Sequence, residues 1–168
     1  MKMVTIEESG VTFGPFVEDV LFHIEKSPHV QGLTGIKVCE FVWWSADQGK
    51  LVFVEAKSSV PNRVNSEQEY ENYFAEIQEK LENSLQLLLT ASLSRPETLG
   101  DELGAGMADV DWQQTDIRLY LVIPRAPLDA LDPLSDKLAG LLKRHLRIWK
   151  ASAKVINESL ARKEGLLN

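Results

Sequence analysis

Four consecutive apolar residues, Leu51–Val54, constrain the fold of this chain more than any other feature. A strand that is apolar on both faces has to be covered on both sides, so it belongs in the interior of a layered sheet. A second apolar segment, 36–44, precedes it, and the five residues 45–49 between them include Gly49, as a hairpin connection requires. The sequence therefore predicts a β-hairpin at the centre of the fold.

A long amphipathic helix is expected after this hairpin. Ser66 and Glu69 have the spacing of a capping box, and apolar residues then recur every three or four positions to about residue 92. The other predicted elements are a strand or hairpin over 3–13, helices over 15–26 and from 132, a loop over 94–114, strands over 117–123 and 153–156, and a last helix over 158–163 with Asn157 as its cap. This order predicts an α/β fold with a mixed β-sheet flanked by helices.

The length of 168 residues fits a single domain over 1–168, with its core at about 15–123 and a C-terminal helical extension at 129–168. The only cysteine, Cys39, excludes an intrachain disulfide and a cysteine-based zinc site. No apolar run approaches the roughly 20 residues that span a bilayer. The first ten residues contain no apolar stretch of signal-peptide length. We therefore expect no membrane partner and a cytoplasmic location.

Charge is distributed unevenly along the chain. The net charge is −7, which argues against an indiscriminate nucleic-acid binder. Residues 1–128 carry 10 Lys/Arg and 20 Asp/Glu, whereas residues 129–168 carry 8 Lys/Arg and 5 Asp/Glu. The C-terminal part can therefore face a phosphate backbone while the acidic part holds metal. A solvated helix face explains the basic residues equally well.

The two strands of the predicted hairpin bring three charged residues together. Side chains alternate along a strand, so Glu55 and Lys57 project to one side. Glu40 interrupts an apolar stripe on the partner strand, and the hairpin register places it opposite Val54 or Glu55. Because facing like charges destabilise a sheet, this pair needs compensation. Lys57 pairs with an acid, a carboxylate keeps a proton, or a divalent cation such as Mg²⁺ or Mn²⁺ joins the two acids.

An acid on one strand, a hairpin, and an apolar strand ending in Glu-x-Lys together resemble the PD-(D/E)XK nuclease superfamily, which has a restriction-endonuclease-like core. The resemblance covers roughly residues 15–123. It implies that Glu40 and Glu55 are the metal-binding acids and that Lys57 is the catalytic lysine. Glu25, or else Glu18, would supply a further metal ligand from the preceding helix.

The chain differs from the family pattern at the first acid. In the family this acid is usually Asp and follows a proline, whereas here it is Glu40, which follows Cys39. The resemblance also allows a weak glutamine candidate, Gln86, on the long helix. The resemblance implies a nuclease that hydrolyses phosphodiester bonds of nucleic acid with Mg²⁺ or Mn²⁺, with DNA as the expected substrate. The alternatives are a catalytically inactive module of the same fold that serves binding or assembly, with a second copy or another protein as partner, and a purely structural domain in which Lys57 pairs with Glu40 or Glu55.

Overall fold

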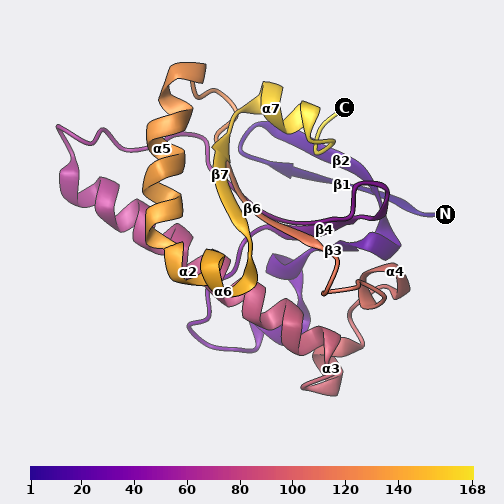
Figure 1. Ribbon diagram of the computed structural model, residues 1–168. Coiled ribbons are helices and arrows are strands. Elements are labelled where there is room, and N and C mark those ends of the chain that lie inside the picture. Colours follow the sequence, from indigo (N-terminus) through magenta and orange to yellow (C-terminus); the bar gives the residue numbers. More distant parts are fainter.

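The computed structural model describes all 168 residues and contains a mixed five-stranded sheet. Its strands, in spatial order, are β3 (Leu21–Phe22), β4 (Phe41–Ser45), β5 (Lys50–Ala56), β6 (Asp116–Val122) and β7 (Ser152–Ile156). The first three strands form an antiparallel meander, and β5, β6 and β7 are parallel (Figure 1). The predicted α/β fold with a mixed sheet and flanking helices is therefore confirmed.

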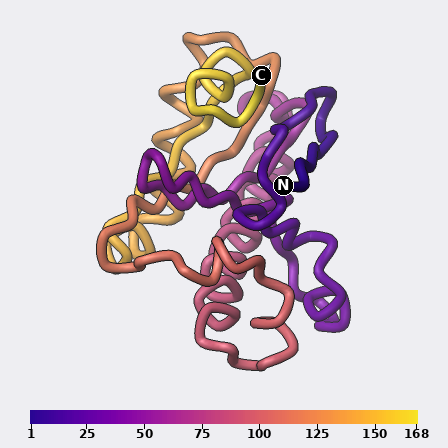
Figure 2. The backbone as a smooth tube through the Cα atoms, turned by 90° about the vertical axis from the view of Figure 1, so that its right-hand side faces the viewer, coloured from indigo at the N-terminus to yellow at the C-terminus, as the bar shows by residue number.

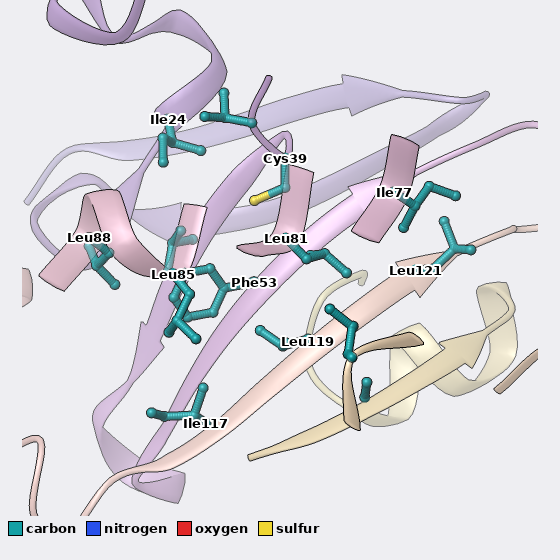
Figure 3. Packing of buried hydrophobic residues seen from close by; sticks show 14 of the residues in the cluster. Ile24, Cys39, Phe53, Ile77, Leu81, Leu85, Leu88, Ile117, Leu119 and Leu121 are labelled. Carbon is teal, nitrogen blue, oxygen red and sulfur yellow. The ribbon is translucent and has the colours of Figure 1, made fainter. Parts of the chain in front are cut away.

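Two helices connect the parallel strands and cover one face of the sheet. The helix α2 (Glu67–Ser92) joins β5 to β6, and α5 (Leu128–Leu141) joins β6 to β7. Figure 3 shows Ile77, Leu81 and Leu85 of α2 against apolar side chains of β5 and β6. The boundaries of α2 match the prediction, although the N-cap residue Ser66 makes no side-chain capping hydrogen bond.

The opposite face is covered by a β-hairpin and by the C-terminal segment. The strands β1 (Met3–Glu8) and β2 (Val11–Val17) form this hairpin, and α7 (Glu158–Lys163) follows β7. Phe13 of β2 packs edge-on against Phe41 of β4, with ring centroids 5.3 Å apart. The C-terminal turn lies beside the hairpin (Figure 2), and the Gly14 amide donates to the Leu166 carbonyl at 2.8 Å. The sheet is thus buried on both faces, as the apolar β5 requires.

The remaining helices are short. They are α1 (Pro28–Gln31), α3 (Glu97–Gly100), α4 (Ala105–Ala108) and α6 (Lys143–Trp149), with 3₁₀ turns at Glu18–Val20, Ile24–Lys26 and Ala46–Gln48. The segment predicted as a loop, 94–114, therefore contains α3 and α4. No helix combines the length and the apolar composition that crossing a membrane requires.

The helix predicted over 15–26 is wrong. Residues up to Val17 belong to β2, and two 3₁₀ turns separated by the two-residue β3 follow. Phe16 and Ile24, which have helical spacing in the sequence, are buried in the clusters on opposite faces of the sheet. Their spacing thus reflects a chain that passes around the sheet edge rather than one helical stripe.

The strand predicted over 36–44 begins only at Phe41. The segment that precedes β4 forms hydrogen bonds with α2 instead of with a strand. The side-chain amide of Asn83 donates to the Lys37 carbonyl at 2.9 Å, and the backbone amide of Cys39 donates to Ser84 Oγ at 2.9 Å. The helix expected from residue 132 begins earlier, at Leu128, and contains Pro133. By contrast, β6, β7 and α7 lie close to where they were predicted, and Asn157 caps α7 by accepting from the Leu160 amide at 3.1 Å.

Candidate functional site

The β4–β5 hairpin places Glu40 opposite Glu55. Phe41 pairs with Val54, and the Glu40 amide donates to the Val54 carbonyl at 2.9 Å, so the pairing continues one residue beyond the start of β4. Both acids lie on the sheet face that α2 covers, because side chains alternate from Val42 and Phe53, which belong to the cluster under α2. Glu40 is 6% exposed and Glu55 is fully buried.

Two more acids reach Glu40 from outside the five-stranded sheet. Glu25 lies in the 3₁₀ turn after β3, where its amide donates to the Glu40 carbonyl at 3.4 Å. Glu8 is the last residue of β1. Carboxylate oxygens of Glu8, Glu25 and Glu40 all lie within 4.8 Å of one another. We refer to Glu8, Glu25, Glu40 and Glu55 as the acidic site.

The helix α2 supplies the cation that pairs with Glu55. Lys80 Nζ lies 3.1 Å from Glu55 Oε2 and 3.4 Å from Oε1, and only the contact with Oε1 has hydrogen-bond geometry. Glu76, one turn earlier, lies 3.8 Å from the same ammonium group. Tyr73, one further turn back, has a buried hydroxyl without a hydrogen-bond partner. One side of α2 therefore presents polar groups to the acidic site.

Lys57 lies at the margin of this arrangement. Its amide donates to the Val122 carbonyl at 3.0 Å, which extends the parallel pairing of β5 with β6. Its ammonium group is 3.9 Å from Glu76 Oε1, and the side chain is 31% exposed. The Lys57 charge helps to lower the pKa of Glu55, although less than Lys80 does. Lys57 is thus close to Glu55 without forming an ion pair with it.

Burial and like charges determine the protonation of the two facing acids. Burial raises the pKa of Glu40 to about 10, and the neighbouring Glu25 and Glu55 carboxyls add to this rise. Burial also raises the pKa of Glu55, while Lys80 acts in the opposite direction. At neutral pH, Glu40 therefore carries a proton, whereas at Glu55 the nearby Lys80 ammonium group counteracts the effect of burial on the pKa.

The donor atoms of the acidic site suit a hard divalent cation. Glu25 Oε2 and Glu40 Oε2 are buried and accept no hydrogen bond from an amide, a hydroxyl or a basic side chain, so the proton that Glu40 keeps is the only compensation for these oxygens away from water. Mg²⁺ and Mn²⁺ prefer oxygen ligands, and the convergent carboxylates offer no nitrogen or sulfur donor. The residues present thus fit a Mg²⁺ or Mn²⁺ ion.

The other residues singled out in the sequence lie away from the acidic site. Glu18 is exposed and pairs with Lys2 at 2.7 Å, and Gln86 lies on the exposed side of α2. Trp43 and Trp44 pack against the clusters on opposite faces of the sheet, so ordinary packing accounts for both. The helix that was to present Glu25 and Glu18 is absent, and Glu25 reaches the acidic site from a turn instead.

Sequence reasoning missed Glu8, Glu76 and Lys80. For α2 a signal exists: Tyr73, Glu76 and Lys80 recur at helical spacing beside the buried stripe, on the side where an acid of the sheet would meet them. For Glu8, strand parity shows that it points the same way as the buried Ile6. Parity does not indicate where the hairpin lies on the sheet, so Glu8 required the structure.

Comparison with known proteins adds no assignment. No protein-family model matches the chain, and neither the curated proteins nor the solved structures contain a significant match to it.

Proposed function

We propose that this chain is a metal-dependent nuclease of the restriction-endonuclease-like type, which hydrolyses phosphodiester bonds of nucleic acid, with DNA as the preferred substrate. The observation that carries the proposal is the convergence of buried carboxylates at the β4–β5 hairpin, with Lys57 two residues after Glu55. The succession of the β4–β5 hairpin, α2 and β6 supports it because the resemblance expects this order, although the helix that the resemblance expects before the hairpin is absent.

In this proposal Glu40 and Glu55, which neighbour each other, hold a Mg²⁺ or Mn²⁺ ion together with Glu25, and Glu8 offers a further carboxylate oxygen within 4.8 Å of those of Glu25 and Glu40. Such an ion supplies Lewis-acid stabilisation of the charge that develops on a phosphoryl oxygen. Glu40 has to release its proton to become a ligand, and the orphaned oxygens of Glu25 and Glu40 gain the partner that the protein does not supply.

In this proposal Lys57 acts on the water that attacks phosphorus. Its partly exposed ammonium group is held only loosely by Glu76, at 3.9 Å. A hydrogen bond from Lys57 would orient the water or steady the developing charge. The water oxygen forms a bond to phosphorus and releases a proton, while the bond from phosphorus to the leaving sugar oxygen breaks and that oxygen gains a proton.

A basic cluster on and beside α6 provides a surface for the phosphate backbone. Its members Lys143, Arg144, Arg147 and Lys150 are exposed, and none forms an ion pair within the protein. His145 of the same helix contacts Glu82 of α2 at 3.1 Å, so α6 lies beside the helix that borders the acidic site. Lys and Arg contacts to phosphate supply most of the sequence-independent affinity for nucleic acid.

The test is cleavage of DNA and RNA by the purified protein with Mn²⁺. We expect slow nicking with the parent protein and none with Lys57→Ala, whose circular dichroism and melting temperature should match the parent. Nicking that persists in the variant would come from a contaminating nuclease and would contradict the assignment.

One observation favours a second function, a binding or assembly module that has kept this fold without catalysis. The Glu55 carboxylate is already paired with Lys80, as it would be in a site that no longer binds metal. This alternative predicts no cleavage of any substrate with any divalent ion, together with binding of DNA that weakens when Arg144 and Arg147 are replaced by Ala.

A further inference from the structure

Lys80 holds Glu55 at the position where the proposed ion would bind. Its ammonium group is within 3.4 Å of both carboxylate oxygens of Glu55. The Lys80 side chain is only 16% exposed, and Glu55 is fully buried. A cation in this place offsets the charge of a buried carboxylate that would otherwise lack compensation. An ion that uses Glu55 as a ligand has to compete with this ammonium group.

The same ammonium group has a second partner close by. Glu76 Oε1 lies 3.8 Å from Lys80 Nζ, and the two residues are one helical turn apart on α2. Lys80 can therefore transfer from Glu55 to Glu76 by rotating its side chain, without any movement of the helix. Burial lowers the pKa of Lys80, but Glu55, Glu40 and Glu76 together outweigh it and raise the pKa, so the group is charged where it lies between Glu55 and Glu76.

We infer that Lys80 is an internal counter-ion that occupies Glu55 in the metal-free protein and yields Glu55 to the divalent ion by moving to Glu76. The inference rests on the proposed metal site. It makes Lys80 a positioning residue: it holds the buried Glu55 carboxyl group in place by direct contact, and it sets the affinity for metal through competition.

The test compares Mn²⁺ affinity among lysine variants by isothermal titration calorimetry. Lys80→Gln removes the competing cation, and we expect its affinity to rise about tenfold, within the usual range for coupled equilibria. Lys80→Arg should bind Mn²⁺ more weakly than the parent, because a guanidinium grips a carboxylate with two hydrogen bonds. The matched control is Lys37→Gln, because Lys37 also pairs with Glu76, at 3.6 Å, but has no contact with Glu55. It should stay within about twofold of the parent, as expected for an exposed ion pair.

Several results would overturn the inference. They are an unchanged or weaker affinity in Lys80→Gln, an equal gain in Lys37→Gln, and the absence of Mn²⁺ binding in both the parent and Lys80→Gln. The outcome is separable from the nuclease proposal. Tighter binding in Lys80→Gln without cleavage of nucleic acid by the parent would refute catalysis and leave the role of Lys80 intact, whereas cleavage with unchanged affinity would refute the role of Lys80 alone.

A second measurement does not depend on the folding of any variant. In crystals of the parent protein soaked with Mn²⁺, Lys80 Nζ should lie beyond the ion-pair limit of about 4 Å from Glu55. It should also be closer to Glu76 than the 3.8 Å described above. A Lys80 that keeps its contact with Glu55 beside a bound ion would overturn the inference.

Discussion

At the residue scale, the acidic site is an arrangement of carboxylates that do not all ionise together. Glu40 illustrates this, because its pKa is raised by burial and by two neighbouring acids. The proton that it keeps lets the chain fold around the converging carboxyls of Glu8, Glu25 and Glu40. A hydrogen-bonding side chain of the same shape but without charge, as in Glu40→Gln, should therefore be tolerated by the fold.

This leads to a prediction for pH dependence. Glu40 has a pKa of about 10 in the folded protein, against its usual 4.5. Between these values the folded chain keeps a proton that the unfolded chain has released, so the free energy of unfolding falls as pH rises. One proton contributes at most about 1.4 kcal/mol per pH unit. Urea denaturation in EDTA at pH 6 and pH 9 should therefore show a smaller difference for Glu40→Gln than for the parent.

The control for this measurement is Glu79→Gln. Glu79 is exposed on α2 and forms no ion pair, so its variant should keep the pH dependence of the parent. If Glu40→Gln showed the same pH dependence as the parent and Glu79→Gln, the pKa of Glu40 in the folded state would be close to its usual 4.5.

At the element scale, α2 does more than cover the sheet, because it fixes the segment that carries Glu40. Ser84 Oγ accepts from the Cys39 amide at 2.9 Å and donates to the Lys80 carbonyl at 2.7 Å. It thereby joins the residue before Glu40 to the helical turn that carries Lys80. The side chain is fully buried, so its loss leaves the Cys39 amide without a partner.

We predict that Ser84→Ala lowers the free energy of unfolding by about 1–3 kcal/mol, the usual penalty for an unsatisfied buried donor. Because Glu40 loses its tether, Mn²⁺ binding should weaken as well. Ser92→Ala is the matched control, since Ser92 Oγ bonds only to a carbonyl of its own helix, that of Leu88. Its stability should change by less than about 0.5 kcal/mol. Equal losses in the two variants would contradict the tethering role.

The elements also show where sequence reasoning succeeds. Local patterns suffice for β5, α2, β6 and α7, because each has a period or a cap that matches its environment. Strand parity and turn length narrow the partner of Glu40 to Val54 or Glu55, and the register of the structure selects Glu55. The helix prediction for 15–26 fails because the apolar residues of this segment are buried on two faces of the sheet. No local pattern distinguishes this burial on two faces from one helical stripe. Glu8 joins the acidic site through tertiary packing alone, whereas helical spacing already places Lys80 beside the buried stripe of α2.

At the scale of the whole molecule, the two ends of the chain close the second layer of the core together. Leu166 and Leu167 are buried in the same cluster as Phe13 and Phe16 of the N-terminal hairpin. The C-terminal β7 also pairs with β6 at the side of the sheet away from the hairpin β4–β5. We therefore expect folding of the acidic site to depend on contacts made by the last twenty residues, although none of those residues lies in it.

This dependence can be tested with Leu166→Ala. Leu166 is fully buried, so its truncation should lower the free energy of unfolding by about 2–5 kcal/mol. If the molecule unfolds as one unit, hydrogen exchange of the most protected amides in β5 should accelerate by the factor that this loss predicts, although β5 lies far along the chain. Leu128→Ala is the control, because Leu128 is 72% exposed and its loss should change stability by less than about 0.5 kcal/mol. Accelerated exchange confined to α7 and the hairpin would show instead that the second layer opens separately, and that the sheet with its acidic site keeps its own stability.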